Sequence, residues 1–444
     1  MAILGVVLAA GPHPPPQQPP ARPQQPSEIS TVISGDATAP LRFAVPDFIA
    51  LSSDAETVAA AKAIGQVLWD DLSFEREFAL IPRDVSTTIP PATSLADVPI
   101  DRWRELNADG VVIGTVQKTP AGILVLVQLV SVKTGQSAFG QEYTGSAANP
   151  RSYAHAISDD LHQKQRALRG VARTKLTFDS DRDGERMTGT VENRNVKEIY
   201  IADYDGANQR RVTTGRSLNI NPTWSPDGRS IAYASYRRGE PNIFISNIYQ
   251  GTLEELTKKA GSNFLPSWSP DGTRVCFMSN RDGHMQLYVA NRDGSNVRRL
   301  LDEKADDGAP TWSPNGTQIA FTSDRSGSPQ IYVIDVDGLR QRRITSDYSD
   351  RPTWSPAPYN EIAFSARTGP GSDIKVIDLA SGQVRQLTFG EGTNESPSWA
   401  PNGRHLAFTS TRSGKTQVFV IARDGKNLRQ ITNTGNNYQP DWSK

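Results

Sequence analysis

The stretch Trp224–Ser235 reads WSPDGRSIAYAS, and related stretches recur to the end of the chain. A tryptophan in the same setting returns every 42–45 residues, at Trp268, Trp312, Trp354, Trp399 and Trp442. A fixed internal period of this length indicates repeated structural units that stack against one another.

Each full repeat contains four short segments of strand type. The WSPDG turn leads into an apolar strand such as IAYAS, and an S-x-R-x-G loop leads into a second strand such as IFISN. A further turn precedes an outer strand that ends in Leu-Thr or Ile-Thr. Pro, Asp and Gly each favour a tight hairpin for a different reason. Four short strands in about 43 residues are typical of one blade of a β-propeller.

The two ends of the repeat region complement each other. Lys175–Ser180 (KLTFDS) matches the second strand of the repeat, but no WSPDG turn precedes it. The tail Gln439–Lys444 (QPDWSK) resembles the missing first strand. We therefore predict a six-bladed β-propeller over residues 171–444, closed by the C-terminal strand, because closure removes exposed sheet edges.

Residues 27–170 have mixed periodicity, which predicts a small α/β domain with a mixed sheet of four or five strands. One helix is expected after Ser52-Ser53-Asp54, where Val58, Ala61, Ile64, Leu68 and Leu72 recur at helical spacing. The other expected elements are strands at Leu41–Phe48, Phe78–Pro82, Val111–Val116, Ile123–Val132 and Ser137–Tyr143, and helices at Ile100–Leu106 and Pro150–Leu168.

Residues 1–26 combine a remnant that resembles a secretory signal with a proline-rich tether. Met1–Ala10 is apolar, ends in small residues and lacks a positively charged start, and it is too short to span a bilayer. Pro12–Pro26 is low-complexity and favours an extended spacer. We expect export and no stable membrane insertion.

The composition argues against several functions. Lys plus Arg and Asp plus Glu both number 48, so charge gives no reason to expect nucleic-acid binding. No two of the five histidines have metal-ligand spacing, and the single cysteine, Cys276, lies in an apolar strand pattern. No nucleophile elbow or phosphate-binding loop occurs. We expect a monomer with no catalytic residues, no metal and no cofactor.

The candidate binding surface is the mouth of the central channel. In a propeller the innermost strand of each blade lines the channel, so the residues before each x-P-x-W motif form a ring. These residues are polar and differ between blades, and they include two aromatic side chains predicted to be exposed. The candidates are Asn219, Asn221, Asn263, Phe264, Asp306, Asp307, Asp350, Arg351, Asn394, Glu395, Asn437 and Tyr438.

The S-x-R-x-G loops are expected on the same face, with one arginine from each blade. These arginines either form a cationic ring that binds carboxylates of a partner or brace their own loops, and their regular repetition favours bracing. They are Arg182, Arg237, Arg281, Arg325, Arg367 and Arg412.

Asp179, Asp181 and Asp183 precede Gly184 at the spacing of a calcium loop. The twelfth position is Thr190 instead of glutamate, and the flanking segments read as strands. These two departures from a calcium loop argue against a calcium site at the three aspartates.

The chain from about Ser27 resembles the TolB family of periplasmic propeller proteins. The resemblance rests on the WSPDG repeats, on the pairing of an α/β domain with Arg173-Thr174-Lys175-Leu176, and on Tyr204-Asp205-Gly206-Ala207-Asn208. Val45-Pro46-x-Phe48 and Ala108–Gly114 (ADGVVIG) add to it.

This resemblance implies a periplasmic protein-binding scaffold of the Tol–Pal system that supports outer-membrane integrity and cell division. The propeller mouth would bind a Pal-like lipoprotein. The N-terminal segment 27–38 would bind a TolA-like protein through Glu28, Ile29, Val32 and Ile33.

Two alternatives remain open. A propeller of this type could bind another envelope protein or a glycan outside Tol–Pal. A propeller enzyme, such as a sugar lyase, would need clustered His, Asp and Glu side chains at the mouth. The two histidines of the propeller, His284 and His405, occupy different repeat positions.

Overall fold

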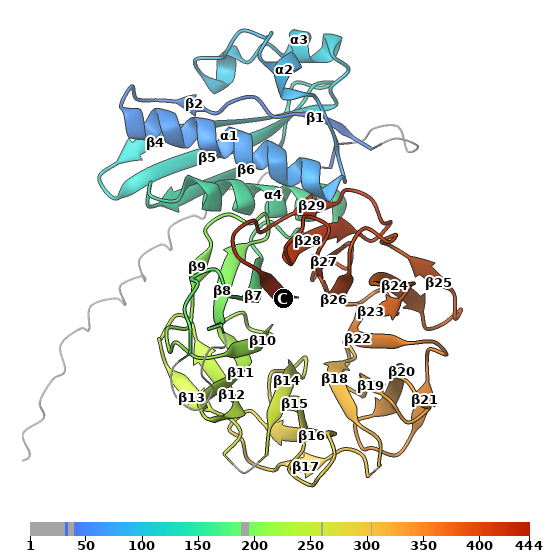
Figure 1. The fold of residues 1–444 in the computed structure, drawn as a ribbon. Helices are drawn as coiled ribbons and strands as arrows, with labels where there is room; N and C mark the ends of the chain where they lie inside the picture. Colours follow the sequence, from blue (N-terminus) through green and yellow to red (C-terminus); the bar gives the residue numbers. More distant parts are fainter. Residues whose placement is uncertain (1–31, 34–39, 188–194, 259–260, 303) are drawn as a thin grey trace, which may run out of the picture.

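The computed structural model describes residues 32–33, 40–187, 195–258, 261–302 and 304–444. The signal-like remnant, the proline-rich tether, Glu28, Ile29 and Thr190 lie outside the described residues. Figure 1 shows a layered unit of sheet and helices placed against one side of a ring of small sheets.

The first unit contains one mixed sheet of six strands, one more than the upper limit expected from the sequence. Its order is β3-β1-β4-β5-β6, and β2 pairs with β4 beside β1. The contacts of β1 and β2 are parallel, whereas β4, β5 and β6 are antiparallel. The strands are β1 (Arg42–Ala44), β2 (Ile49–Ala50), β3 (Ala79–Leu80), β4 (Gly110–Thr119), β5 (Gly122–Ser131) and β6 (Ser137–Gly145).

The strand expected at Leu41–Phe48 is wrong in its extent. It ends at Ala44, and pairing with β4 resumes only at Ile49. Pro46 lies in the gap and cannot donate to a strand ladder, which accounts for the interruption.

Helices cover both faces of this sheet. α1 (Ala55–Glu75) and α4 (Pro150–Arg166) bury one face, and the short elements α2 (Arg83–Ser86), η1 (Leu95–Asp97) and α3 (Ile100–Glu105) lie over the other. α1 begins after Asp54, whose carboxylate accepts the Thr57 backbone N–H at 3.0 Å, as an N-cap residue does. Val58, one of the five apolar residues at helical spacing, is exposed, and α1 also buries Asp71 and Glu75 at its C-terminal end.

The described part of residues 175–444 forms six antiparallel sheets of four strands each, which confirms the predicted six-bladed propeller. The inner strands are β10 (Asn219–Trp224), β14 (Asn263–Trp268), β18 (Asp307–Trp312), β22 (Ser349–Trp354), β26 (Asn394–Trp399) and β30 (Asn437–Trp442). The second strands are β11 (Ser230–Arg238), β15 (Arg274–Ser279), β19 (Gln318–Ser323), β23 (Glu361–Arg367), β27 (His405–Ser410) and β7 (Lys175–Ser180).

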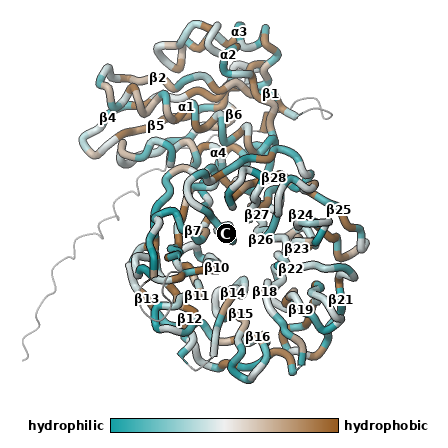
Figure 2. The backbone as a smooth tube through the Cα atoms, in the orientation of Figure 1, coloured by the Kyte–Doolittle hydropathy of each residue, from teal (hydrophilic) through white to brown (hydrophobic). Residues whose placement is uncertain are grey.

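The third strands are β12 (Glu240–Asn247), β16 (Gln286–Asn291), β20 (Gln330–Asp335), β24 (Ser372–Asp378), β28 (Gln417–Ala422) and β8 (Glu198–Asp203). The outer strands are β13 (Leu253–Glu255), β17 (Arg298–Arg299), β21 (Gln341–Arg343), β25 (Val384–Gln386), β29 (Arg429–Gln430) and β9 (Arg210–Arg211). In Figure 2, hydrophobic stretches recur in blade after blade around the ring.

Neighbouring blades pack through apolar side chains. Cys276 and Leu287 from one sheet share a buried cluster with Trp312 and Phe321 from the next. Each of the six repeat tryptophans lies in a buried apolar cluster and is therefore a packing residue. Burial raises the pKa of the Cys276 thiol well above its usual range.

The ring closes as the sequence predicts. β30 pairs antiparallel with β7, with Trp442 opposite Leu176 and Tyr438 opposite Asp179. The Lys175 backbone N–H also donates to Ser443 Oγ at 2.9 Å. The last residues of the chain thus complete the sheet that β7 begins.

The first unit contacts the propeller at the seam formed by the closing sheet and the sheet of β26–β29. Phe74 of α1 packs between Tyr204, which follows β8, and His405 of β27, with ring centroids 4.9 and 4.4 Å away. The Tyr204 hydroxyl donates to Asp71 at 2.7 Å, and Arg404 forms an ion pair with Glu75. Buried polar side chains therefore join the two units.

We expect removal of residues 438–444 to abolish cooperative folding. The truncation would leave β7 without its partner strand everywhere except at Ser180 and would remove Trp442 from its buried cluster. Thermal unfolding followed by circular dichroism tests this, and a truncated chain that melts cooperatively near the wild-type temperature would contradict the closure.

We expect His405 to make the protein less stable in acid. Burial, with Arg404 close by, lowers the pKa of His405 to about 3 from its usual 6.5. Between these values only the unfolded chain takes up this proton, so the free energy of unfolding decreases as pH falls through the window.

A His405→Phe variant keeps the ring stacked on Phe74 and removes the titrating group. Denaturant unfolding between pH 3.5 and 7 should therefore show a pH slope that is shallower by up to about 1.4 kcal/mol per pH unit. Equal slopes in variant and wild type would contradict this role of His405.

Candidate partner-binding site at the channel mouth

A bulge shapes every inner strand of the ring. The pairing register shifts after the second residue of each strand, as between Ile220 and Thr223 in β10. The third residue has a positive φ in all six strands although none is glycine: Asn221 (57°), Leu265 (49°), Ala309 (48°), Arg351 (53°), Ser396 (56°) and Gln439 (50°). Each of these residues precedes the proline of the repeat, and the bulge bends the strand at that point.

The bulges, the prolines and the residues after the prolines line a cavity of about 130 Å³ on the mouth side of the channel. The residues after the prolines are Thr or Ser in five strands and Asp441 in the sixth. Asp441 accepts hydrogen bonds from Thr223 Oγ1, Ser398 Oγ and the Trp224 backbone N–H. Asp441 therefore links its own blade to both neighbouring blades.

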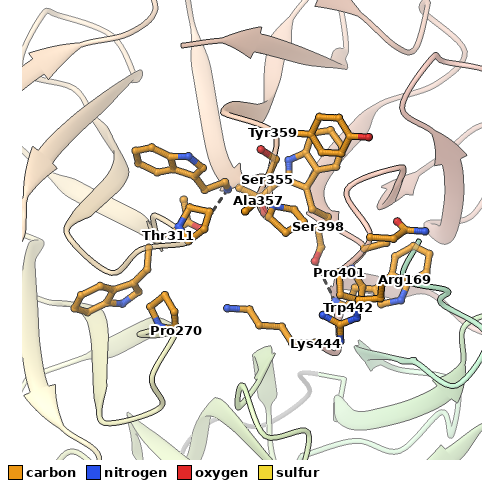
Figure 3. A pocket seen from close by; sticks show the side chains of 18 of the residues that line it. Arg169, Pro270, Thr311, Ser355, Ala357, Tyr359, Ser398, Pro401, Trp442 and Lys444 are labelled. Atoms are coloured by element: carbon orange, nitrogen blue, oxygen red, sulfur yellow. Dashed lines mark hydrogen bonds between the residues drawn. The ribbon is translucent and has the colours of Figure 1, made fainter. Parts of the chain in front are cut away.

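A larger chamber of about 610 Å³ lies on the other side of that ring. Its lining includes all six repeat tryptophans and several prolines of the WSPDG-type turns. Figure 3 shows the Lys444 side chain extended into this chamber, with Tyr359, Pro401 and Trp442 around it.

The first residue of most inner strands is buried and braced by the loop arginine. The Arg281 guanidinium donates to Asn263 Oδ1 at 2.8 Å, and Arg325 donates to Asp307 Oδ1 at 2.8 Å. The other two pairs are Arg412 with Asn394 at 3.0 Å and Arg182 with Asn437 at 2.7 Å. In these four blades the arginine braces its own blade, which is the interpretation that the regular repetition favoured.

The same guanidinium groups stack on aromatic rings. The Arg281 guanidinium carbon lies 4.7 Å from the Tyr288 ring centroid, and that of Arg325 lies 4.8 Å from Tyr332. Arg237 and Arg367 also lie over aromatic rings, but their guanidinium groups have no hydrogen bond with any described residue.

The structure therefore divides the twelve candidate mouth residues into two groups. The buried group hydrogen-bonds within the propeller and consists of Asn219, Asn221, Asn263, Asp307, Asn394 and Asn437. The accessible group consists of Phe264, Asp306, Asp350, Arg351, Glu395 and Tyr438. Contact of any of the twelve with a partner stays a prediction, and the second group offers the surface for it.

Phe264 and Tyr438, predicted to be exposed, are only partly so. Phe264 packs against Tyr236, with ring centroids 6.2 Å apart. The Lys197 amine lies 3.3 Å from the centre of the Tyr438 ring and 3.0 Å from Asp179 Oδ2. Lys197 was not predicted, because it lies just before β8, outside the inner strands, and no repeat position marks it.

The three aspartates of the calcium-like motif contact different partners. Asp179 pairs with Lys197, Asp181 accepts hydrogen bonds from Asn436, and Asp183 accepts one from the Tyr200 hydroxyl. Their carboxylates therefore do not converge on one point in the described residues.

Of the predicted N-terminal segment, only Val32 and Ile33 are described. Val32 is exposed, whereas Ile33 is buried against the first sheet and its backbone N–H donates to Gln165 Oε1 at 3.0 Å. Val32 alone is thus accessible here, and its contact with a partner stays a prediction.

Two family models match the chain. The TolB amino-terminal domain matches residues 29–138, and the TolB beta propeller domain matches residues 166–358 and 347–444. The chain belongs to the TolB family. The resemblance seen in the sequence is therefore confirmed.

Curated TolB relatives align with part of this chain. "Tol-Pal system protein TolB" of Desulfosudis oleivorans is 32% identical over 206 residues, and its namesake in Cereibacter sphaeroides is 31% identical over 208 residues. Each alignment covers 46% of this chain and 44% of the relative, so the match spans less than half the length of these TolB proteins.

The crystal structure of TolB from Acinetobacter baumannii has the same fold. It superposes with a TM-score of 0.77 over 91% of this chain and 97% of the TolB chain, at 24% identity. Among the described residues of this TolB-family chain, none of the helices combines the length and apolar character needed to cross a bilayer.

We expect the arginine brace to stabilise this TolB-family propeller. Arg281→Ala would leave the buried Asn263 oxygen without its donor and should lower the free energy of unfolding by about 1–3 kcal/mol. Arg237→Ala is the matched control and should change it by no more than about 0.5 kcal/mol. Urea unfolding measures both, and equal losses would show that the hydrogen bond is not what stabilises the loop.

Proposed function

We propose that this protein is a non-catalytic scaffold of the Tol–Pal envelope system, exported to the periplasm, where it supports outer-membrane integrity and cell division. Its propeller mouth would bind a Pal-like lipoprotein, and its N-terminal segment would bind a TolA-like protein. Membership of the TolB family and the names of the Tol-Pal relatives support this assignment.

The observation that carries the proposal is the construction of the mouth. A bulge at the third residue fixes the backbone of each inner strand, and an arginine brace holds the first residue in four of them. The second residue differs from blade to blade: Ile220, Phe264, Gly308, Asp350, Glu395 and Tyr438. Rigid presentation of varied side chains lowers the entropy cost of binding a protein.

The aromatic and acidic side chains of this ring suit a partner that offers apolar and basic groups. Phe264 and Glu395 lie on opposite sides of the ring, three blades apart, so a bound segment would contact both only by spanning the mouth. Buried aromatic residues near the centre of an interface commonly contribute most of the affinity.

The test is a pull-down and a titration of the full chain with the Pal-like lipoprotein of the same organism. The double variant Phe264→Ala/Glu395→Ala should weaken binding at least tenfold, because it removes two mouth contacts and leaves every arginine brace in place. Variants of Asn263 or Asp307 are poor probes, since both side chains are buried structural partners.

A matched control removes an aromatic and an acidic side chain elsewhere. Tyr249 and Glu254 are exposed near the outer edge of one blade, beside the turn that follows β12. Tyr249→Ala/Glu254→Ala should bind like wild type. Wild-type affinity in the mouth variant would exclude the mouth as the site, and a wild-type chain that does not bind the lipoprotein would favour a partner outside Tol–Pal.

A further inference from the structure

The chamber bordered by the six repeat tryptophans, here called the tryptophan chamber, lies across the hydroxyl ring from the mouth. Prolines of the turns that follow the tryptophans, such as Pro270, Pro314 and Pro401, also border it. Ala167–Arg169, which come directly after α4, form another part of its wall. A cavity of about 610 Å³ with an aromatic and proline-rich lining has the size and character of a small-molecule site.

The tryptophans contact the chamber with a small part of their surface. Each is packed between blades, and the most exposed of them, Trp354, is only 9% exposed. The rings are therefore held in place by the blades before any ligand arrives. A binding wall that is already ordered costs little entropy when a ligand binds to it.

The charged side chains of the chamber wall leave two cations without an anionic partner. Arg404 forms an ion pair with Glu75, and Asp441 accepts three hydrogen bonds from the two neighbouring blades. Lys444 and Arg169 form no ion pair with any described carboxylate. Figure 3 shows both side chains at the chamber. The chamber therefore offers two positive charges to an anion.

The same two cations also border a second cavity of about 360 Å³, so they lie where two cavities adjoin. The carboxylates that border this second cavity, Asp159 and Asp160, both pair with Arg173, at 2.9 and 3.0 Å. They therefore do not neutralise Lys444 or Arg169. An anionic group placed between these two cations would form charge-assisted hydrogen bonds, which are among the strongest in proteins.

We propose that the tryptophan chamber binds an amphiphilic organic anion. A carboxylate of this ligand would contact Lys444 and Arg169, and its apolar body would lie against the tryptophans and prolines. A polyphosphate would bring several negative charges close to Asp441, and an organic cation would meet Lys444 and Arg169. A single carboxylate on an apolar body, as in a medium-chain fatty acid, is therefore the chemistry that the wall fits.

A ligand in this chamber would contact both the segment that follows α4 and the propeller. Because it would bind this folded arrangement and not the unfolded chain, it should raise the melting temperature of the full chain as its concentration rises. The repeat pattern could not indicate this site, since it assigns the tryptophans to blade packing, and the chamber exists only once the ring has closed.

The experiment is a titration of the full chain with sodium decanoate below its micelle-forming concentration. Six of the eight tryptophans border the chamber, so tryptophan fluorescence should report binding directly. Isothermal titration calorimetry should show one decanoate bound per chain. Decyltrimethylammonium has the same alkyl chain with the opposite charge and should bind at least tenfold more weakly.

Two variants test the cations. Lys444→Gln and Arg169→Gln each remove one charged donor, and each should weaken decanoate binding about tenfold. The matched control is Lys415→Gln, because Lys415 is exposed in the loop that contains Arg412, away from the chamber wall. This control should bind decanoate like wild type.

A third variant tests the location without changing a charge. Ser267 borders both the mouth cavity and the tryptophan chamber, so Ser267→Phe should fill part of the chamber and weaken binding at least tenfold. Cooperative thermal unfolding of each variant shows that it is folded before its affinity is compared.

Three results would overturn the proposal. They are a wild-type chain without saturable decanoate binding, a Lys444→Gln/Arg169→Gln double variant with wild-type affinity, and equal affinity for decanoate and decyltrimethylammonium. The mouth variant Phe264→Ala/Glu395→Ala should bind decanoate like wild type. Loss of decanoate binding in that variant would instead place the ligand at the mouth and contradict the assignment to the chamber.

Discussion

The pairing of β30 with β7 is the constraint on which the rest of the structure depends. It places Trp442 opposite Leu176 and gives every blade a neighbour on both sides. The first unit contacts the ring at the same place, because Phe74 lies between Tyr204 of the closing sheet and His405 of the adjacent sheet. The two ends of the propeller and the attachment of the first unit therefore share one seam.

The sequence predicts the propeller better than the first unit, and the reason is redundancy. Six tryptophans at a regular period and a tail that supplies a missing strand agree on one ring. In the first unit each element occurs once, so Pro46 could interrupt a strand and Val58 could face solvent without any repeat to correct the prediction. α1 also buries Asp71 and Glu75, whose partners Tyr204 and Arg404 are 133 and 329 residues away.

The candidate site shows a similar division. Alignment of the repeats correctly placed the inner strands and the arginine loops at one end of the channel. The alignment could not show which polar residues are accessible. An asparagine at the start of a strand can face solvent, or it can accept a hydrogen bond from the arginine of its own blade's loop. A signal was present, since Arg281 follows Asn263 by 18 residues and Arg412 follows Asn394 by 18 residues. This spacing alone does not predict the brace, however, because Arg237 follows Asn219 by the same number of residues, yet the Asn219 side chain donates a hydrogen bond to Glu198.

The residue with positive φ before each proline lines the cavity at the mouth of the channel. Behind these bulges the bore is bordered by proline rings, small hydroxyl side chains and Asp441, and the same hydroxyl ring borders both the mouth cavity and the tryptophan chamber. Replacing the larger side chains at the rim would leave this inner part of the channel unchanged, because the prolines, the small hydroxyl side chains and Asp441 border it. The side chains at the channel mouth and the width of the inner channel can therefore change independently. Homologues can thus differ in binding specificity while the inner channel keeps its width.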